Sequence, residues 1–194
     1  LSECLVDDLV AQLVDAGCVL LASFLMLSQQ RLSALINALM LHSLLLAASV
    51  AWQAHMQHSP HLYVTALIAL AFKAVLIPVV LRRMVRQLGM HREIEAVTGT
   101  GISMLIGIGL VALSLNVVLP VTATVEAVAR EDIALALSVV LIGLLMMVTR
   151  RNAVSQVVGF MSLENGIILA AAGAQGMPLV VEISVAFSIL IAFI

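Results

Sequence analysis

Charged side chains are scarce in this sequence. Only 10% of its residues are Asp, Glu, Lys or Arg, whereas 63% are hydrophobic and the mean hydropathy is +1.19. Because a soluble domain needs a polar shell around its core, this composition excludes one and indicates an integral membrane protein. The two cysteines, Cys4 and Cys18, form no CxxC pair and have no histidine nearby at ligand spacing, so they predict no metal site.

Long apolar runs dominate what is present. Seven windows are long enough, or nearly so, to cross a bilayer as a helix of about 20 residues. They cover residues 9–28, 32–52, 62–81, 99–119, 133–148, 154–173 and 178–194. The connector at 123–132 has room for a short helix on the membrane surface. We therefore expect an all-α polytopic membrane protein with about seven transmembrane helices.

The two ends of the sequence lead to two expectations. The first window has an acidic flank where a secretory signal would be basic, so we expect it to be a retained span. The chain starts at Leu1 and stops at Ile194 within an apolar run, which indicates trimming at both ends.

The arginines between the windows predict an orientation. With the N-terminus outside, seven of the eight fall in inner loops, as the positive-inside rule requires. The inner set is Arg31, Arg82, Arg83, Arg86, Arg92, Arg150 and Arg151, and the outer one is Arg130. An odd number of spans then places the C-terminus inside.

Two segments indicate a degenerate internal repeat. SALINALMLHSLLLAA from Ser33 resembles SQVVGFMSLENGIILAA from Ser155, and each follows an apolar helix and a short polar turn. The repeat places His42 at the position of Glu164. Chance similarity between Leu- and Ala-rich helices remains the alternative.

Five ionisable residues fall inside the windows: Asp15, His42, Lys73, Glu164 and Glu182. A charge near the centre of a membrane helix costs roughly 2.5 to 3.5 kcal/mol on insertion scales, so these residues are expected to face protein or a wet cavity. One reading is that they hold helices together by hydrogen bonds. Several acids, a base and an imidazole in one small bundle favour the other reading, a proton relay.

Pro78 follows Lys73 in the same window. A proline within a helix removes a backbone hydrogen bond, so a kink beside the lysine is one expectation and a tolerated proline near a helix end is the other.

The C-terminal third carries a family resemblance. Residues 143–169 contain an RRN turn and a mid-helix glutamate in an LEN setting, and residues 178–193 place a second glutamate before an S-V-A-F-S-I run. These features resemble the three-helix K subunit of complex I and the C subunit of Mrp-type cation/proton antiporters. Together with the AFKAVLIPVVLRR segment and four further N-terminal helices, the whole chain looks like hydrogenase-4 component E, a membrane subunit of formate hydrogenlyase and related nickel–iron hydrogenases.

The resemblance implies a function and a division of the chain. Glu164 and Glu182 would match the paired glutamates of the K subunit's proton path, and Lys73 would lie in the third helix of the component E type. The histidine at position 42 departs from the glutamate of the repeat, which leaves open whether the N-terminal half carries protons. Residues 1–132 would form a four-helix region with the possible surface helix, and residues 133–194 a three-helix region.

By the same resemblance, the chain is expected to be a non-catalytic membrane subunit of a proton-translocating oxidoreductase in a bacterial or archaeal cytoplasmic membrane. It would hold no cofactor, metal or nucleic acid. The nickel–iron centre and iron–sulfur clusters would lie on peripheral partner subunits, beside antiporter-like and quinone-site-like membrane subunits. The alternatives are a subunit of a cation/proton antiporter and a purely structural membrane scaffold.

Overall fold

A computed structural model describes residues 2–56, 63–64, 66–67, 69–87, 99–121 and 127–173. Regular structure in this part of the chain is helical throughout. The helices are α1 (Ser2–Ser28), α2 (Leu32–Met56), η1 (Ala69–Leu76), α4 (Ile77–Gln87), α5 (Thr100–Val121), α6 (Ala127–Thr149) and α7 (Ala153–Gly173). Element η1 is a π-helix that runs directly into α4.

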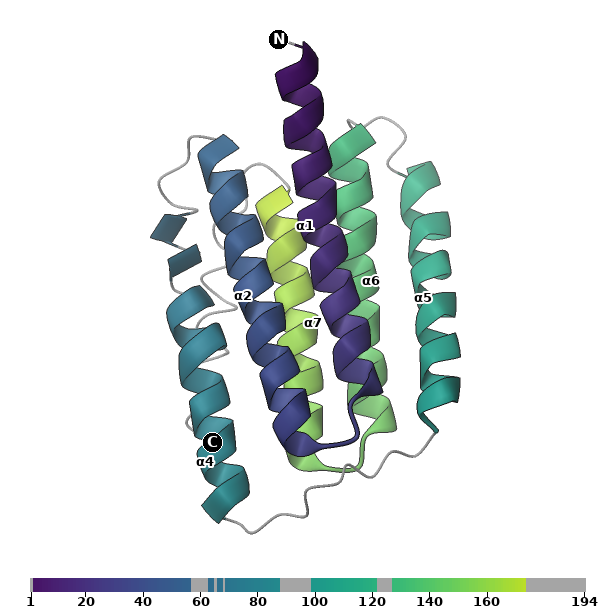
Figure 1. Ribbon diagram of the computed structural model, residues 1–194. Coiled ribbons are helices and arrows are strands. Elements are labelled where there is room, and N and C mark those ends of the chain that lie inside the picture. Colours follow the sequence, from purple (N-terminus) through teal and green to yellow (C-terminus); the bar gives the residue numbers. More distant parts are fainter. Residues whose placement is uncertain are drawn as a thin grey trace.

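Two helical hairpins form the centre of the bundle (Figure 1). α1 and α2 make one hairpin and α6 and α7 the other, with both tight turns at the same end. The hairpins stack so that α1 packs against α6 and α2 against α7. η1 and α4 lie beside α2 on one flank, and α5 lies beside α6 on the other.

Glycines allow α6 and α7 to approach each other backbone to backbone. A Cβ atom added at Gly143 would lie 2.5 Å from the backbone nitrogen of Leu163, and one at Gly159 would lie 3.0 Å from the carbonyl oxygen of Gly143. Small residues at helix contacts are typical of membrane bundles, where packing replaces the hydrophobic driving force. This contact fixes the rotation of α7 about its own axis.

Polar groups fix the turn between α6 and α7. The Asn152 side chain accepts a hydrogen bond from the Val154 backbone N–H at 2.9 Å, which is the usual helix N-cap geometry. The buried Arg150 guanidinium donates to the Leu27 carbonyl oxygen at 2.6 Å and so joins the ends of the two hairpins. Desolvation on burial lowers the pKa of Arg150 from its ordinary value.

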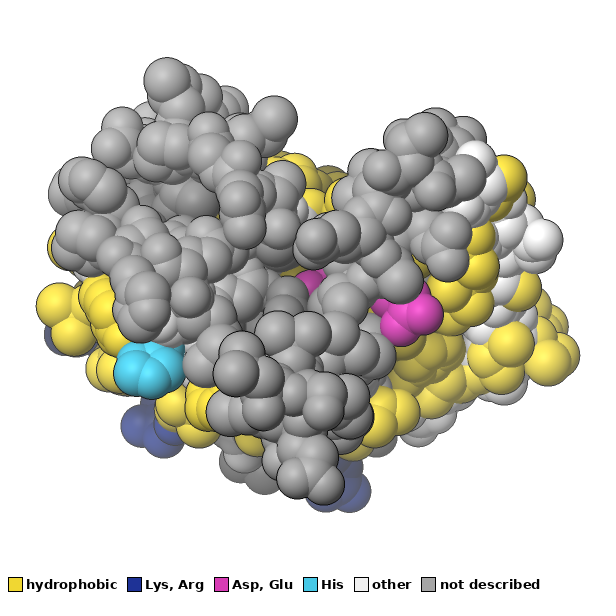
Figure 2. Space-filling model, turned by 90° about the horizontal axis from the view of Figure 1, so that it is seen from above, with side chains coloured by type: hydrophobic (Ala, Val, Ile, Leu, Met, Phe, Trp, Pro, Cys, Tyr) yellow, Lys and Arg dark blue, Asp and Glu magenta, His cyan; other side chains and the backbone are white. Residues whose placement is uncertain are grey.

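The sides of the bundle are apolar. Figure 2 shows hydrophobic side chains along its flanks, and α5 exposes large ones such as Ile102, Leu105 and Ile108. The described part contains four helices long and apolar enough to cross a membrane, and the segment Ala16–Ser28 is a shorter apolar helix. An exposed apolar surface of this extent indicates a multi-pass membrane protein.

Helices occupy the described parts of the first six predicted windows, and several of them extend further than the windows did. Residues 127–132, where the sequence left room for a surface helix, are the first turns of α6, and the predicted division at 132/133 falls inside that helix. α6 also packs against α1, so the two predicted regions are joined in one bundle. The seventh window and positions 123–126 lie outside the described residues.

Candidate functional site

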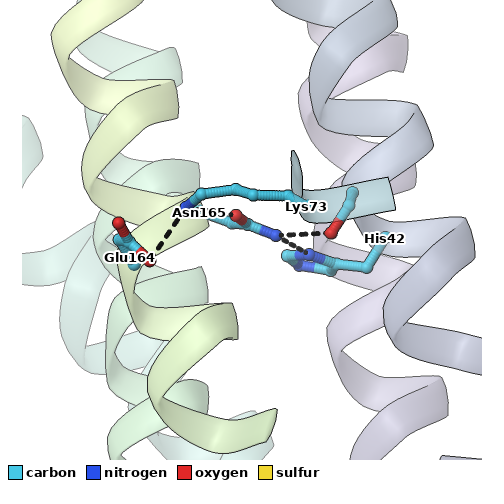
Figure 3. Close-up of polar contacts among 5 residues, drawn as sticks. His42, Lys73, Glu164 and Asn165 are labelled. Carbon is cyan, nitrogen blue, oxygen red and sulfur yellow. Dashed lines mark hydrogen bonds and ion pairs between the residues drawn. The ribbon is translucent and has the colours of Figure 1, made fainter. Parts of the chain in front are cut away.

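Three of the five predicted site residues meet inside the bundle. His42 on α2, Lys73 on η1 and Glu164 on α7 are all buried and lie close together (Figure 3). Asp15 belongs to α1, but its side chain lies outside the described part, as does the whole of Glu182. The described cluster therefore comprises a histidine, a lysine and a glutamate from three helical elements.

Lys73 and Glu164 form an ion pair. The Lys73 Nζ atom lies 3.0 Å from Glu164 Oε2, and the two side chains are only 3% and 4% exposed. Lys73 thus faces protein, one of the two surroundings expected from the sequence, and the group that it meets there is an acid. Removing two charges from water is expensive, and their attraction offsets that cost only where the geometry is good and additional hydrogen bonds satisfy the charged groups.

Asn165 connects the ion pair to the histidine. Its Oδ1 accepts a hydrogen bond from Lys73 Nζ at 3.0 Å, and its Nδ2 lies 2.9 Å from His42 Nδ1 and donates to Ser43 Oγ at 3.3 Å. An amide has one acceptor oxygen and two N–H donors, and here each finds a partner. The amide thus presents its oxygen to the cation and its N–H groups to α2.

The contacts of His42 select one tautomer. Since Asn165 donates to Nδ1, that nitrogen is the acceptor, and the ring proton lies on Nε2. Nε2 is 2.9 Å from Ser23 Oγ, which in turn donates to the Val19 carbonyl oxygen at 3.1 Å. A continuous polar chain therefore runs from Glu164 through Lys73, Asn165 and His42 to Ser23, across four helical elements.

Helix register places the cluster near the middle of the bundle. Glu164 lies 11 residues after the first residue of α7, Ala153, and His42 lies 10 residues after the first residue of α2, Leu32. At about 1.5 Å per residue, both side chains originate roughly 15–17 Å from the shared end of the hairpins. Since a hydrocarbon core is about 30 Å thick, this depth corresponds to the centre of a bilayer.

The backbone at Lys73 is unusual. Lys73 belongs to the π-helix η1, and Pro78 follows just inside α4. Proline has no N–H to donate to the preceding turn, and a π-turn is a common way for a helix to accommodate such a break, often at functional sites. Of the two readings of Pro78, the structure therefore supports the local distortion.

The proposed repeat finds a structural counterpart in this cluster. Ser43 and Asn165 are 122 positions apart and hydrogen-bond to each other, and His42 and Glu164 have the same separation. Corresponding helices of the two hairpins lie side by side. The duplication itself stays a prediction.

Sequence reasoning did not select Asn165, Ser23 or Ser43. Asn165 was visible as the last letter of the LEN motif, but an uncharged amide costs less to insert than a charge and was passed over. The serines resemble those that are common in membrane helices. Among the described residues, no group of three His, Cys, Asp or Glu side chains could hold a metal ion.

Comparison with known proteins identifies one relative. The chain is 33% identical over 186 residues to a Mycobacterium tuberculosis protein named "Uncharacterized protein Rv0085", a match that covers 94% of this chain and 84% of that protein. No family model matches the chain. No solved structure matches it either.

Proposed function

The chain belongs to the same family as Rv0085 of Mycobacterium tuberculosis, whose name states no activity. From the geometry of the site we propose that this chain is a membrane subunit of a proton-translocating oxidoreductase complex. In this role the chain supplies intramembrane proton-transfer groups, and electrons move in partner subunits. The observation that carries the proposal is the buried Lys73–Glu164 pair, extended by Asn165 and His42 across the bundle.

The cost of the pair argues for a role beyond adhesion. Replacing a buried ion pair by well-packed apolar side chains is often neutral or stabilising, so such a pair is a poor way to hold helices together. The close glycine contact between α6 and α7 already holds helices of this bundle together without burying a charge. Titratable groups at this depth in a membrane protein commonly mark proton pathways.

One proton can cross the pair in three balanced steps. Glu164 as carboxylate takes up a proton from one side, which gives a carboxylic acid beside the Lys73 ammonium. Lys73 then releases a proton onward and becomes a neutral amine. Transfer of the Glu164 proton to Nζ across the 3.0 Å contact restores the ion pair, and one proton has moved.

Asn165 couples this pair to His42. In the present arrangement its oxygen faces Lys73 and its NH₂ group faces His42, which suits a charged lysine and a neutral imidazole. Rotation of the amide by half a turn would present NH₂ to a neutral amine and oxygen to a protonated Nδ1. The amide thus favours one positive charge at a time, on Lys73 or on His42, and acts as a positioning residue between them.

The sequence resemblance supplies the biological context of the proposal. By its likeness to hydrogenase-4 component E, the complex would be of the nickel–iron hydrogenase or complex I-related type, in a bacterial or archaeal cytoplasmic membrane. Glu182 would continue the proton pathway beyond Glu164, and Asp15 would act as a proton-transfer group nearer the outer surface. Cofactors would reside on peripheral hydrogenase and iron–sulfur subunits, and antiporter-like and quinone-site-like subunits would be the neighbours in the membrane.

Identification of the partners tests the proposal. The full chain, tagged and expressed in its own host, is purified in mild detergent, and the associated subunits are identified by mass spectrometry with measurement of bound iron. We expect iron-containing redox subunits in fixed ratio to this chain, and the same set with Glu164→Gln, since the substitution preserves shape. Copurification of antiporter subunits without iron would favour a cation/proton antiporter instead. A chain that purifies without other subunits would contradict the proposal that it belongs to an oxidoreductase complex.

A further inference from the structure

A second polar site lies at the end of the bundle that carries the hairpin turns, well away from the buried pair. A pocket of about 660 Å³ opens between the start of α2 and the last turns of α4. Arg31, Arg82 and Arg86 line it, and its described lining contains no acidic residue. This volume lies within the range typical of small-molecule sites.

The three arginines have no ion-pair partner among the described residues. Arg82 donates through Nη2 to Asn37 Oδ1 and to Met40 Sδ, and both of these partners are neutral. Arg31 and Arg86 are exposed. The first turn of α2, where helix geometry leaves backbone N–H groups without partners in the helix, lies at the same pocket and adds to the positive potential. Within the ranges that the structure describes, nothing supplies a balancing anion to the pocket.

The rest of the lining is suited to a lipid rather than to a small ion. The partly exposed Val85 lines the same pocket, the buried Leu32 and Ile36 lie behind its wall, and the volume is far larger than one phosphate group requires. α4 also exposes the apolar side chains of Val79 and Met84, as expected for a helix that faces lipid. Basic pockets between transmembrane helices on the cytoplasmic side are typical sites for anionic headgroups.

We propose that this pocket binds the phosphate headgroup of an anionic phospholipid, with Arg31, Arg82 and Arg86 as the phosphate ligands and Val85 against the glycerol and upper acyl chain. Arg82 is pre-positioned by Asn37, Arg31 closes on the headgroup from the turn before α2, and Arg86 closes on it from α4. Lipid bound there would join these two helices at the end of the bundle. The inference is independent of the proton-transfer role.

The test compares two double variants of the full chain in lipid nanodiscs of phosphatidylcholine. Arg31→Gln/Arg86→Gln removes two pocket arginines, and Arg83→Gln/Arg151→Gln removes two exposed arginines that do not line the pocket. The probe is phosphatidylglycerol, and binding is followed by native mass spectrometry and by the rise in Tm. At about fivefold in affinity per arginine, the pocket variant should bind roughly 25-fold more weakly, and the control within about twofold of wild type.

Three results would overturn the proposal. Equal losses in the two double variants would mean that only the overall surface charge attracts lipid. Inorganic phosphate that raises the Tm as much as phosphatidylglycerol does would mean a small-anion site. Unchanged phosphatidylglycerol binding in the pocket variant would mean that the arginines have no role. The Tm measured in phosphatidylcholine alone shows that each variant is folded before lipid is added.

Discussion

Asn165 holds the central position among the residues of the site, although it carries no charge. It contacts Lys73, His42 and Ser43, which come from two other helical elements. Lys73 could otherwise pair with Glu164 without any link to α2. The amide is therefore the residue whose loss should separate the ion pair from His42 while leaving the pair itself in place.

Asn165→Leu should reduce the number of protons moved per electron, by at least about tenfold if the amide is required at each turnover. It removes one of the two acceptors of Lys73 and the donor to His42 Nδ1, and a buried polar group left unpaired costs about 1–3 kcal/mol. The measurement is proton translocation and electron transfer in parallel on the purified complex. Asn116→Leu is the matched control, because Asn116 is exposed on α5 and donates to Ala112 of its own helix. If Asn165→Leu and Asn116→Leu move the same number of protons per electron, Asn165 has no role in proton transfer.

Residue types in the site could be predicted from the sequence, but their pairing could not. Any ionisable residue in a membrane span is expensive, which singled out His42, Lys73 and Glu164. Lys73 and Asn165 are 92 positions apart, and contact between them depends on which helices are neighbours and how each is rotated. Those are properties of tertiary packing, which local periodicity does not encode.

The pair of helices α6 and α7 sets the geometry of the site at the scale of elements. Gly143, Gly159 and Gly166 lie where the two backbones meet, so α7 presents Glu164 and Asn165 to the bundle interior in a fixed register. The helix windows themselves were predictable, because an apolar run of about 20 residues has the length and composition of a membrane-spanning helix. The π-helix was predictable only as a kink near Pro78, because the sequence does not show which hydrogen-bonding pattern a helix adopts before a proline.

Gly143→Ala should destabilise the protein by about 1–3 kcal/mol, as overpacking in a tight contact does. The new Cβ would lie 2.5 Å from the Leu163 backbone nitrogen and 2.8 Å from the Gly159 oxygen, so the helices would have to separate. The measurement is reversible unfolding of the full chain in mixed detergent micelles. Gly101→Ala is the control, since nothing lies within 4 Å of its added Cβ, and it should leave stability equal or slightly raised. Similar behaviour of the two variants would contradict the packing argument.

The whole molecule has a strongly asymmetric distribution of arginines. Arg31, the three arginines of α4, and Arg150 with Arg151 all lie toward the end of the bundle with the hairpin turns (Figure 1). Arg92 lies outside the described residues. This asymmetry agrees with the positive-inside pattern, and the number of seven spans and the orientation with the N-terminus outside remain predictions.

Cysteine labelling tests that topology. In a Cys4→Ser/Cys18→Ser background, single cysteines at Ser59 and Gln87 are exposed to an impermeant maleimide in intact cells. Position 59 should react from outside, and position 87 should react only after the membrane is opened, because positive loops stay in the cytoplasm. Reaction of both positions from the same side would be incompatible with the seven-span arrangement.

The central claim, that the buried Lys73–Glu164 pair moves protons, is tested most directly by Glu164→Gln in the purified complex reconstituted into sealed vesicles. Glutamine keeps the shape and hydrogen-bonding capacity of the side chain but cannot titrate. We expect an assembled complex with electron transfer partly retained, proton translocation reduced by at least about tenfold, and a milder loss in Glu164→Asp, which retains the carboxyl group. If Glu164→Gln translocates as many protons per electron as wild type, the pair only holds helices together and the proton-transfer assignment is wrong.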